Sequence, residues 1–250
     1  MQIQKEKKHA KFRFSFVLLF IFTSFAACFA MYMRSESDDI LPASKTLNEE
    51  NNEEITGGEE FIEKTSVINP VPKSARADDG YFDNVLILAS NQMRGLSDYG
   101  AVPRDNICTD DFSPSDIITS GAASFVDGKN FESVYIMFGA SAAASADFSE
   151  LTEFIEKLGN ENDSVKIYLT SLIPLKSDSE TEDLTNSKID SFNSILLGFA
   201  NENNVYYIDL NTFLVGNDGK LPKSKAESVG DRLKKDTYLE IADFLLTHIA

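Results

Sequence analysis

The chain has 250 residues, of which 42% are hydrophobic, no tryptophan, and a formal net charge of −17 at pH 7. This length gives room for one ordinary domain plus extra segments, and such an acidic chain repels phosphate backbones, which argues against nucleic acid as a partner. With only two cysteines, Cys28 and Cys108, the chain is neither a disulfide scaffold nor a cysteine-based zinc protein.

The chain starts with a basic tail at residues 1–13, followed by an uncharged apolar run, FSFVLLFIFTSFAACFAMYM, at residues 14–33. Twenty apolar residues can span a bilayer as one helix. The basic flank favours the cytoplasm, which places residues 34–250 outside the cell. We therefore expect an uncleaved single-pass membrane anchor. The alternatives are removal as a signal peptide, for which Cys28–Ala30 is a poor cleavage site, and lipidation at the weak lipobox 25–28.

An acidic segment follows at residues 34–80 and contains the stretches EENNEE, GGEE and INPVPKSARADDG. Its apolar residues are sparse and show no period, so we expect a disordered or extended linker.

From residue 81 to 250, short apolar runs alternate with helical patterns. The expected strands are residues 84–89, 133–138, 165–170 and 205–210, each apolar on both faces as buried parallel strands are. The expected helices are residues 147–158, 186–203 and 236–249. This alternation predicts an α/β domain with three α/β/α layers and a mostly parallel sheet.

Small polar residues follow three of the expected strands, as Ala89-Ser90-Asn91, Gly139-Ala140-Ser141 and Thr170-Ser171. Ligands of parallel sheets bind outside the carboxyl ends of the strands. These three segments therefore predict a site on one rim of the sheet.

The blocks VLILASNQMRGL, ESVYIMFGASA, VKIYLTSLIPLKS and KIDSFNSILLGFANENNVYYIDL occur in this order. Together they resemble the SGNH (GDSL-type) hydrolases, especially small extracytoplasmic members from bacteria. The resemblance covers residues 81–250 and implies the flavodoxin-like SGNH hydrolase fold. It also implies carboxylic ester hydrolysis by a serine, with no cofactor and no metal.

In such proteins the first block carries Gly-Asp-Ser, with the serine as nucleophile. By this resemblance Asn91 stands at the nucleophile position and Ser90 at the preceding aspartate. The third block carries Gly-x-Asn, whose asparagine donates to the oxyanion. Here Gly139 is kept and Ser141 replaces the asparagine.

The remaining catalytic positions are replaced as well. Asp111 falls at the glycine that helps to form the oxyanion site, although the register of this block is open. Val229 stands at the position of the catalytic aspartate and Arg232 at that of the histidine. A slip of one residue would bring Asp231 near the aspartate position, but Lys234 would then replace the histidine.

The residue chemistry agrees with this assignment. A serine esterase needs a hydroxyl, a base and donors for the oxyanion. Asn91 has no hydroxyl, and an arginine cannot accept a proton. His9 precedes the apolar run and His248 lies two residues from the end of the chain. Ser90 as a relocated nucleophile stays an alternative, although no base for it is evident.

Other motifs have simpler explanations. Asp110 and Asp111 could bind a cation, but adjacent carboxylates are more often solvated, and we expect no metal site. Asn162-Asp163-Ser164 matches a glycosylation sequon that is common by chance. Arg94 and Arg104 near the rim could meet an anionic ligand, or could be ordinary surface arginines.

We therefore expect a membrane-anchored, extracytoplasmic pseudoenzyme that binds a cell-wall glycan or an envelope protein. One alternative is a weak or atypical esterase or acyltransferase that acts on acyl groups of cell-surface polysaccharide. A third is a structural domain whose pocket binds nothing.

Overall fold

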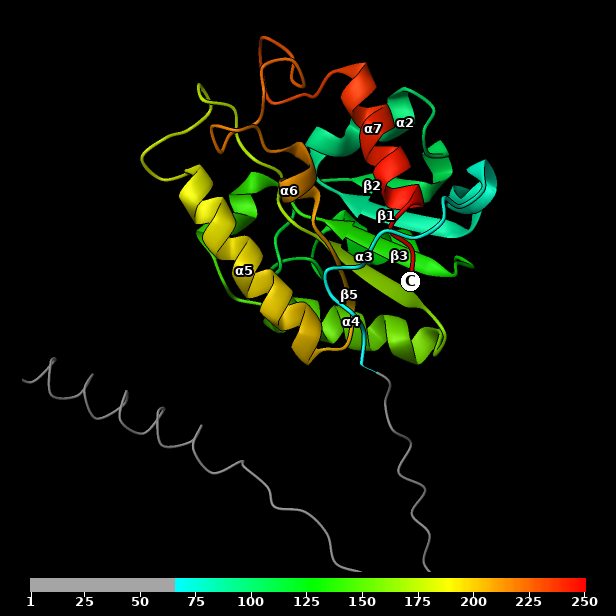
Figure 1. Ribbon diagram of the computed structural model, residues 1–250. Helices are drawn as coiled ribbons and strands as arrows, with labels where there is room; N and C mark the ends of the chain where they lie inside the picture. Colours follow the sequence, from blue (N-terminus) through cyan, green and yellow to red (C-terminus); the bar gives the residue numbers. More distant parts are fainter. Residues whose placement is uncertain (1–65) are drawn as a thin grey trace, which may run out of the picture. The chain divides into compact units, whose positions relative to one another are not determined.

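A five-stranded, wholly parallel sheet is the centre of the computed structural model, which describes residues 66–250 (Figure 1). The strand order is β2-β1-β3-β4-β5. Their bounds are β1 Val85–Ala89, β2 Ile107–Thr109, β3 Ser133–Met137, β4 Lys166–Thr170 and β5 Tyr206–Ile208. The basic tail, the expected anchor and most of the linker lie outside the described residues.

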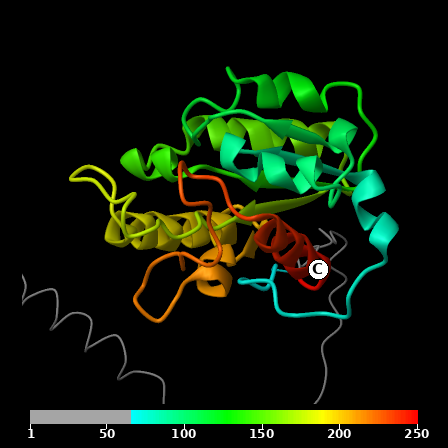
Figure 2. The same ribbon diagram turned by 90° about the horizontal axis from the view of Figure 1, so that it is seen from above.

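Helices cover both faces of the sheet, so the predicted three-layer α/β/α architecture is confirmed (Figures 1 and 2). One face packs against α2, α6 and α7, and the other against α3, α4 and α5. Their bounds are α2 Gly95–Asp98, α3 Gly121–Val126, α4 Ser149–Glu161, α5 Asn186–Glu202, α6 Leu210–Leu214 and α7 Lys235–Leu246. Within residues 66–250, none of the helices combines the length and apolar character that crossing a membrane requires.

Successive side chains of a strand point to opposite faces of the sheet, so each apolar strand contributes to both hydrophobic cores. In β1, Val85, Ile87 and Ala89 contribute to one core, while Leu86 and Leu88 contribute to the other. All five side chains are buried, as the continuous apolar run predicts for a central parallel strand.

The four expected strands and three expected helices are present, with shifted ends. The predicted helix 236–249 ends earlier, at Leu246. Strand β2 was not predicted, because it has only three residues and two of them are partly exposed. Short 3-10 helices fill several strand–helix connections: η1 Asp79–Asn84, η2 Asn91–Arg94, η3 Arg104–Asn106 and η4 Ala140–Ala144.

Residues 66–77, which we name the strap, differ from the expected linker because they pack on the domain. The Asn69 side chain accepts from Tyr207 N (2.6 Å) and donates to Val205 O (2.9 Å), so it continues the hydrogen bonding of edge strand β5. Val71 N donates to Tyr207 O at 2.8 Å, and Ala77 N donates to Leu246 O at 2.9 Å. Backbone and amide hydrogen bonds, rather than an apolar pattern, therefore order this segment, and the domain begins before residue 81.

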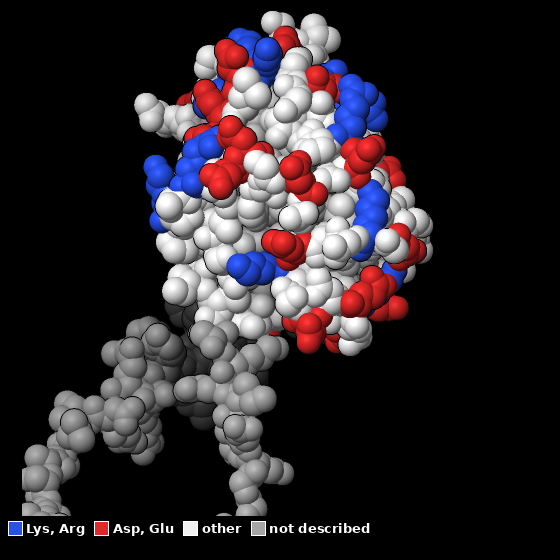
Figure 3. Space-filling model, turned by 90° about the vertical axis from the view of Figure 1, so that its right-hand side faces the viewer, with Lys and Arg blue, Asp and Glu red and all other residues white. Residues whose placement is uncertain are grey.

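Basic and acidic side chains are interspersed on the surface. On the face shown in Figure 3, Lys and Arg lie among Asp and Glu instead of gathering by sign. Exposed ion pairs such as Arg76–Asp243 (2.6 Å) and Lys157–Asp127 (2.6 Å) are examples of this mixing.

Candidate functional site

The carboxyl ends of β1, β2 and β3 bring the first, second and third blocks together. Ser90 follows β1 and its N–H donates to Met137 O, the last residue of β3, at 2.9 Å. Asp110 follows β2 and its N–H donates to Ala89 O at 3.0 Å. The strand order therefore places these segments on one rim, where parallel sheets bind ligands.

Ser90 lies beneath Gly139 and is 1% exposed. A Cβ on Gly139 would lie 3.0 Å from Ser90 Cβ, so a larger residue there would have to push the two segments apart by a few tenths of an ångström. Ser90 Oγ is buried and has no hydrogen-bond partner among the described residues. A nucleophilic hydroxyl needs a base to take its proton, and no acceptor lies within hydrogen-bonding distance of Ser90 Oγ among the described residues.

Asn91 is exposed at the start of η2, and its backbone N–H faces a carboxylate. It donates to Asp111 Oδ1 at 3.4 Å. The structure thus brings together two of the residues that the sequence assigned to the site. A negative charge at this place opposes the development of a further negative charge, which is the reverse of what an oxyanion site requires.

The acidic pair beside Asn91 is satisfied by backbone amides. Asp110 Oδ1 accepts from Asp111 N at 2.9 Å, and Asp110 Oδ2 accepts from Gly121 N at 3.4 Å. No cluster of three or more His, Cys, Asp or Glu side chains suited to a metal occurs in the described part of the chain.

Ser141 lies in η4 next to Gly139 and is exposed. Its Oγ is 3.9 Å from the position of a Cβ on Gly139, so Ser141 borders the same rim as Ser90. A hydroxyl can donate a hydrogen bond here, but it is shorter than the asparagine amide that the resemblance implies.

Residues 227–232, which we name the rim loop, carry the two remaining positions. Val229 is 86% exposed. Arg232 donates to Asp98 Oδ2 at 2.8 Å, and this carboxylate raises the pKa of Arg232. Asp98 also lies 3.6 Å from Arg104, so Arg104 and Arg232 share one acidic partner. Neither Val229 nor Arg232 can act as a base here.

Side chains that the sequence did not single out hold the rim loop. Gln92 Nε2 donates to Asp231 O at 2.6 Å. Lys176 Nζ donates to Gly230 O at 2.7 Å and to Glu227 O at 3.3 Å. No sequence signal marked these roles, because a single lysine after an apolar run is usually read as solvent-exposed.

His248, the histidine within the described residues, lies far from the rim. Helix α7 separates the two places: Tyr238 in its first turns donates to Gln92 O at 2.6 Å, whereas His248 follows the last turn and stacks on Phe244 with ring centroids 3.8 Å apart. Ten residues of α-helix span about 15 Å. His248 therefore lies outside the candidate site.

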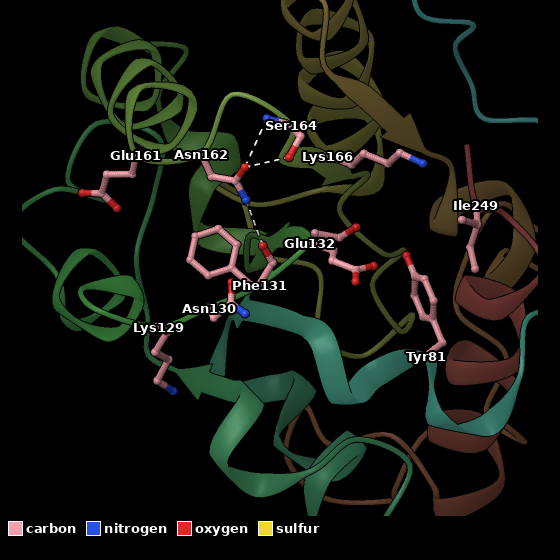
Figure 4. Close-up of a pocket in the computed structure, with 11 residues that line it drawn as sticks. Tyr81, Lys129, Asn130, Phe131, Glu132, Glu161, Asn162, Ser164, Lys166 and Ile249 are labelled. Atoms are coloured by element: carbon pink, nitrogen blue, oxygen red, sulfur yellow. Dashed lines mark hydrogen bonds between the residues drawn. The ribbon is translucent and has the colours of Figure 1, made fainter.

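The cavities at the two edges of the sheet differ in volume. The cavity at the rim, lined by Gln92, Ala140, Lys176 and Asp231 among others, has a volume of about 30 Å³. A larger hollow of about 580 Å³ lies at the amino ends of β3 and β4 (Figure 4). Asn162 of the sequon borders this hollow, and its side chain donates to Phe131 O at 3.0 Å. The hollow is at the opposite edge from the rim, so it does not contribute to the candidate site.

Comparison with known proteins agrees with this architecture. No family model and no curated protein sequence matches the chain. Among solved structures, a provisionally named platelet activating factor from Streptococcus pneumonia is 16% identical with a TM-score of 0.53, over 65% of this chain and 81% of that one. An acylhydrolase from Bacteroides fragilis is 15% identical (TM-score 0.49, 70% and 88%), and a GDSL-like lipase from Bacteroides thetaiotaomicron is 13% identical (0.47, 68% and 89%). At these identities the likeness is one of fold alone, and it is carried by the first of these structures, whose TM-score exceeds 0.5. Residues 66–250 share its α/β fold, in agreement with the architecture that the resemblance of the sequence blocks implied.

Proposed function

We propose that the domain is a non-catalytic binding module with an SGNH hydrolase fold, which binds a glycan or a protein of the cell envelope. The observation that carries this proposal is the absence of a nucleophile–base pair at the rim among the described residues. Ser90 Oγ has no partner, Asn91 replaces the nucleophile, and Arg232 is paired with Asp98.

The exposed polar side chains at the rim are suited to bind a ligand by hydrogen bonds. Asn91 and Ser141 are exposed there, and amide and hydroxyl groups both donate and accept hydrogen bonds. The sugar hydroxyls of a glycan offer the same mixture of donors and acceptors. The carboxylate of Asp111 adds a strong acceptor.

The same proposal places the domain outside the cell, tethered by the apolar run at residues 14–33. Its support is the length of the run and the basic residues before it.

The first experiment measures hydrolysis of a short activated acyl ester by residues 66–250, which keep the strap. A heat-denatured sample gives the background, and a Ser90→Ala variant runs in parallel. We expect no turnover above background in either protein. Turnover that Ser90→Ala abolishes would establish a relocated nucleophile and overturn the proposal.

The second experiment measures binding of soluble cell-wall glycan fragments by calorimetric titration. Asn91→Lys places a long side chain on the rim and should weaken binding. Asn130→Lys is the matched control, because Asn130 is also exposed but borders the hollow at the opposite edge. Equal effects of the two variants would show that a bound glycan is not held at the rim.

A further inference from the structure

The rim loop is fixed by a buried charge. The Lys176 side chain is 9% exposed, and a buried ammonium is costly unless it is paired and hydrogen-bonded. Its two hydrogen-bond acceptors are the carbonyl oxygens of Gly230 and Glu227, at 2.7 and 3.3 Å. The carboxylate of Asp178 lies 3.8 Å away and is 64% exposed, so it is a weaker partner. The rim loop therefore supplies most of what stabilises this charge.

A second side chain holds the same loop from another strand end. Gln92, in η2 after β1, donates to Asp231 O at 2.6 Å, while Lys176 belongs to the segment after β4. The side chains of Gln92 and Lys176, which follow different strands, thus donate to three backbone carbonyls of the rim loop: those of Glu227, Gly230 and Asp231. Both also line the rim cavity of about 30 Å³, a volume that holds about one or two water molecules.

We propose that Lys176 is a positioning residue that latches the rim loop over the carboxyl ends of the strands, with Gln92 as its helper. This inference rests on the proposed function, because it concerns access to the same rim. While Lys176 and Gln92 hold the rim loop in place, a ligand can contact the outer surface of the rim but finds no deep pocket there. Opening the loop would enlarge the cavity, and it requires Lys176 to give up both carbonyl acceptors.

Amide hydrogen exchange on the full chain tests the latch without any ligand, so its outcome is independent of what the domain binds. Within and beside the rim loop, Glu227 N donates to Arg232 O at 2.9 Å and Leu233 N donates to the Tyr238 hydroxyl at 3.1 Å. Lys176→Met keeps the apolar stem and removes the donors. Exchange at Glu227 and Leu233 should rise by about tenfold, as expected for the loss of a charge-assisted hydrogen bond.

A latch differs from a merely structural lysine in the locality of the effect. Exchange in α4 should stay unchanged in Lys176→Met, whereas a general loss of stability would raise it together with the loop. Lys157→Met is the matched control, since it removes an ammonium that pairs with Asp127 at 2.6 Å on another part of the surface. It should leave the exchange of the rim loop unchanged.

Gln92→Met gives a second test that does not alter a buried charge. It removes the bond to Asp231 O and should also raise exchange in the rim loop, even if Lys176→Met fails to fold. Unchanged exchange at Glu227 and Leu233 in a folded Lys176→Met protein would overturn the latch. So would unchanged exchange in Gln92→Met if the lysine variant does not fold.

Discussion

Replacing Gly95 with alanine tests how the turn after β1 is locked to α7. A Cβ on Gly95 would lie 2.1 Å from Tyr238 Cε2 and 2.4 Å from Cδ2 and Cζ. The ring is fully buried. Its hydroxyl donates to Gln92 O at 2.6 Å and accepts from Leu233 N at 3.1 Å. The ring therefore cannot move away from the new methyl group without weakening both bonds, which join the rim to α7.

The expected magnitude follows from three terms. Overpacking a filled core costs about 2 kcal/mol, and two weakened hydrogen bonds cost about 1 kcal/mol each. Replacing a helical glycine with alanine returns up to about 1 kcal/mol. The net loss of stability is about 3 kcal/mol, which lowers Tm by roughly 6–12 °C for a domain of this size.

Urea denaturation of wild type and variant measures this loss. Gly198→Ala is the matched control, because Gly198 lies inside α5 and a Cβ there would meet nothing within 4 Å. It should be neutral or stabilising by up to about 1 kcal/mol. Removing the clash with Tyr238→Leu should make the double variant less destabilised than the sum of the single changes. A Gly95→Ala protein as stable as wild type would refute the reasoning.

Three further predictions concern catalysis, acid stability and the strap. Asn91→Ser alone should give no ester hydrolysis, because the base is also missing, while Asn91→Ser with Val229→Asp and Arg232→His has a better chance; turnover by the single variant in the activated-ester assay would contradict our account. Backbone and side-chain hydrogen bonds from Asn186, together with Lys220, lower the pKa of Glu180 from 4.5 to about 2. Glu180 thus stabilises the fold above pH 4.5 and loses this effect as the pH falls towards 2. The difference in Tm between wild type and Glu180→Gln should therefore shrink over that interval. A difference that stayed constant would refute the assignment. Asn69→Ala should cost about 1–3 kcal/mol in urea denaturation, because it removes the partner of Tyr207 N in β5 and of Val205 O just before it. An unchanged midpoint would show that the strap does not contribute through this amide.

Apolar periodicity predicted the parts of the fold that are held by apolar burial. Four strands and three helices were found with ends shifted by a few residues, because each carries a pattern that only one secondary structure can bury. The strap and β2 were missed for the opposite reason. Residues 66–77 are held through backbone and amide hydrogen bonds, and no period in the sequence records which partners such bonds will find.

The sequence predicted which candidate residues lie close together, but it did not predict their surroundings. The order of the blocks placed Ser90, Asn91 and Gly139 on one rim, and the structure brings them together there. The sequence could not show that Ser90 would be buried beneath Gly139, or that Arg232 would turn to Asp98. Both outcomes depend on residues more than forty positions apart in the chain, whose approach only the tertiary fold determines.

The positions that the sequence resemblance assigns to the nucleophile and to the oxyanion glycine, Asn91 and Asp111, are coupled through the charge of Asp111. A serine at position 91 would still have the Asp111 carboxylate beside its backbone N–H, where the Asn91 N–H lies 3.4 Å from Asp111 Oδ1. A transition state that develops negative charge would therefore meet repulsion at the group that should stabilise it. Restoring a nucleophile and a base leaves this repulsion in place, so the effects of the individual restorations cannot add. In our proposal the Asp111 carboxylate therefore disfavours ester hydrolysis at the rim, whereas a neutral ligand with hydroxyl donors would find the same carboxylate favourable.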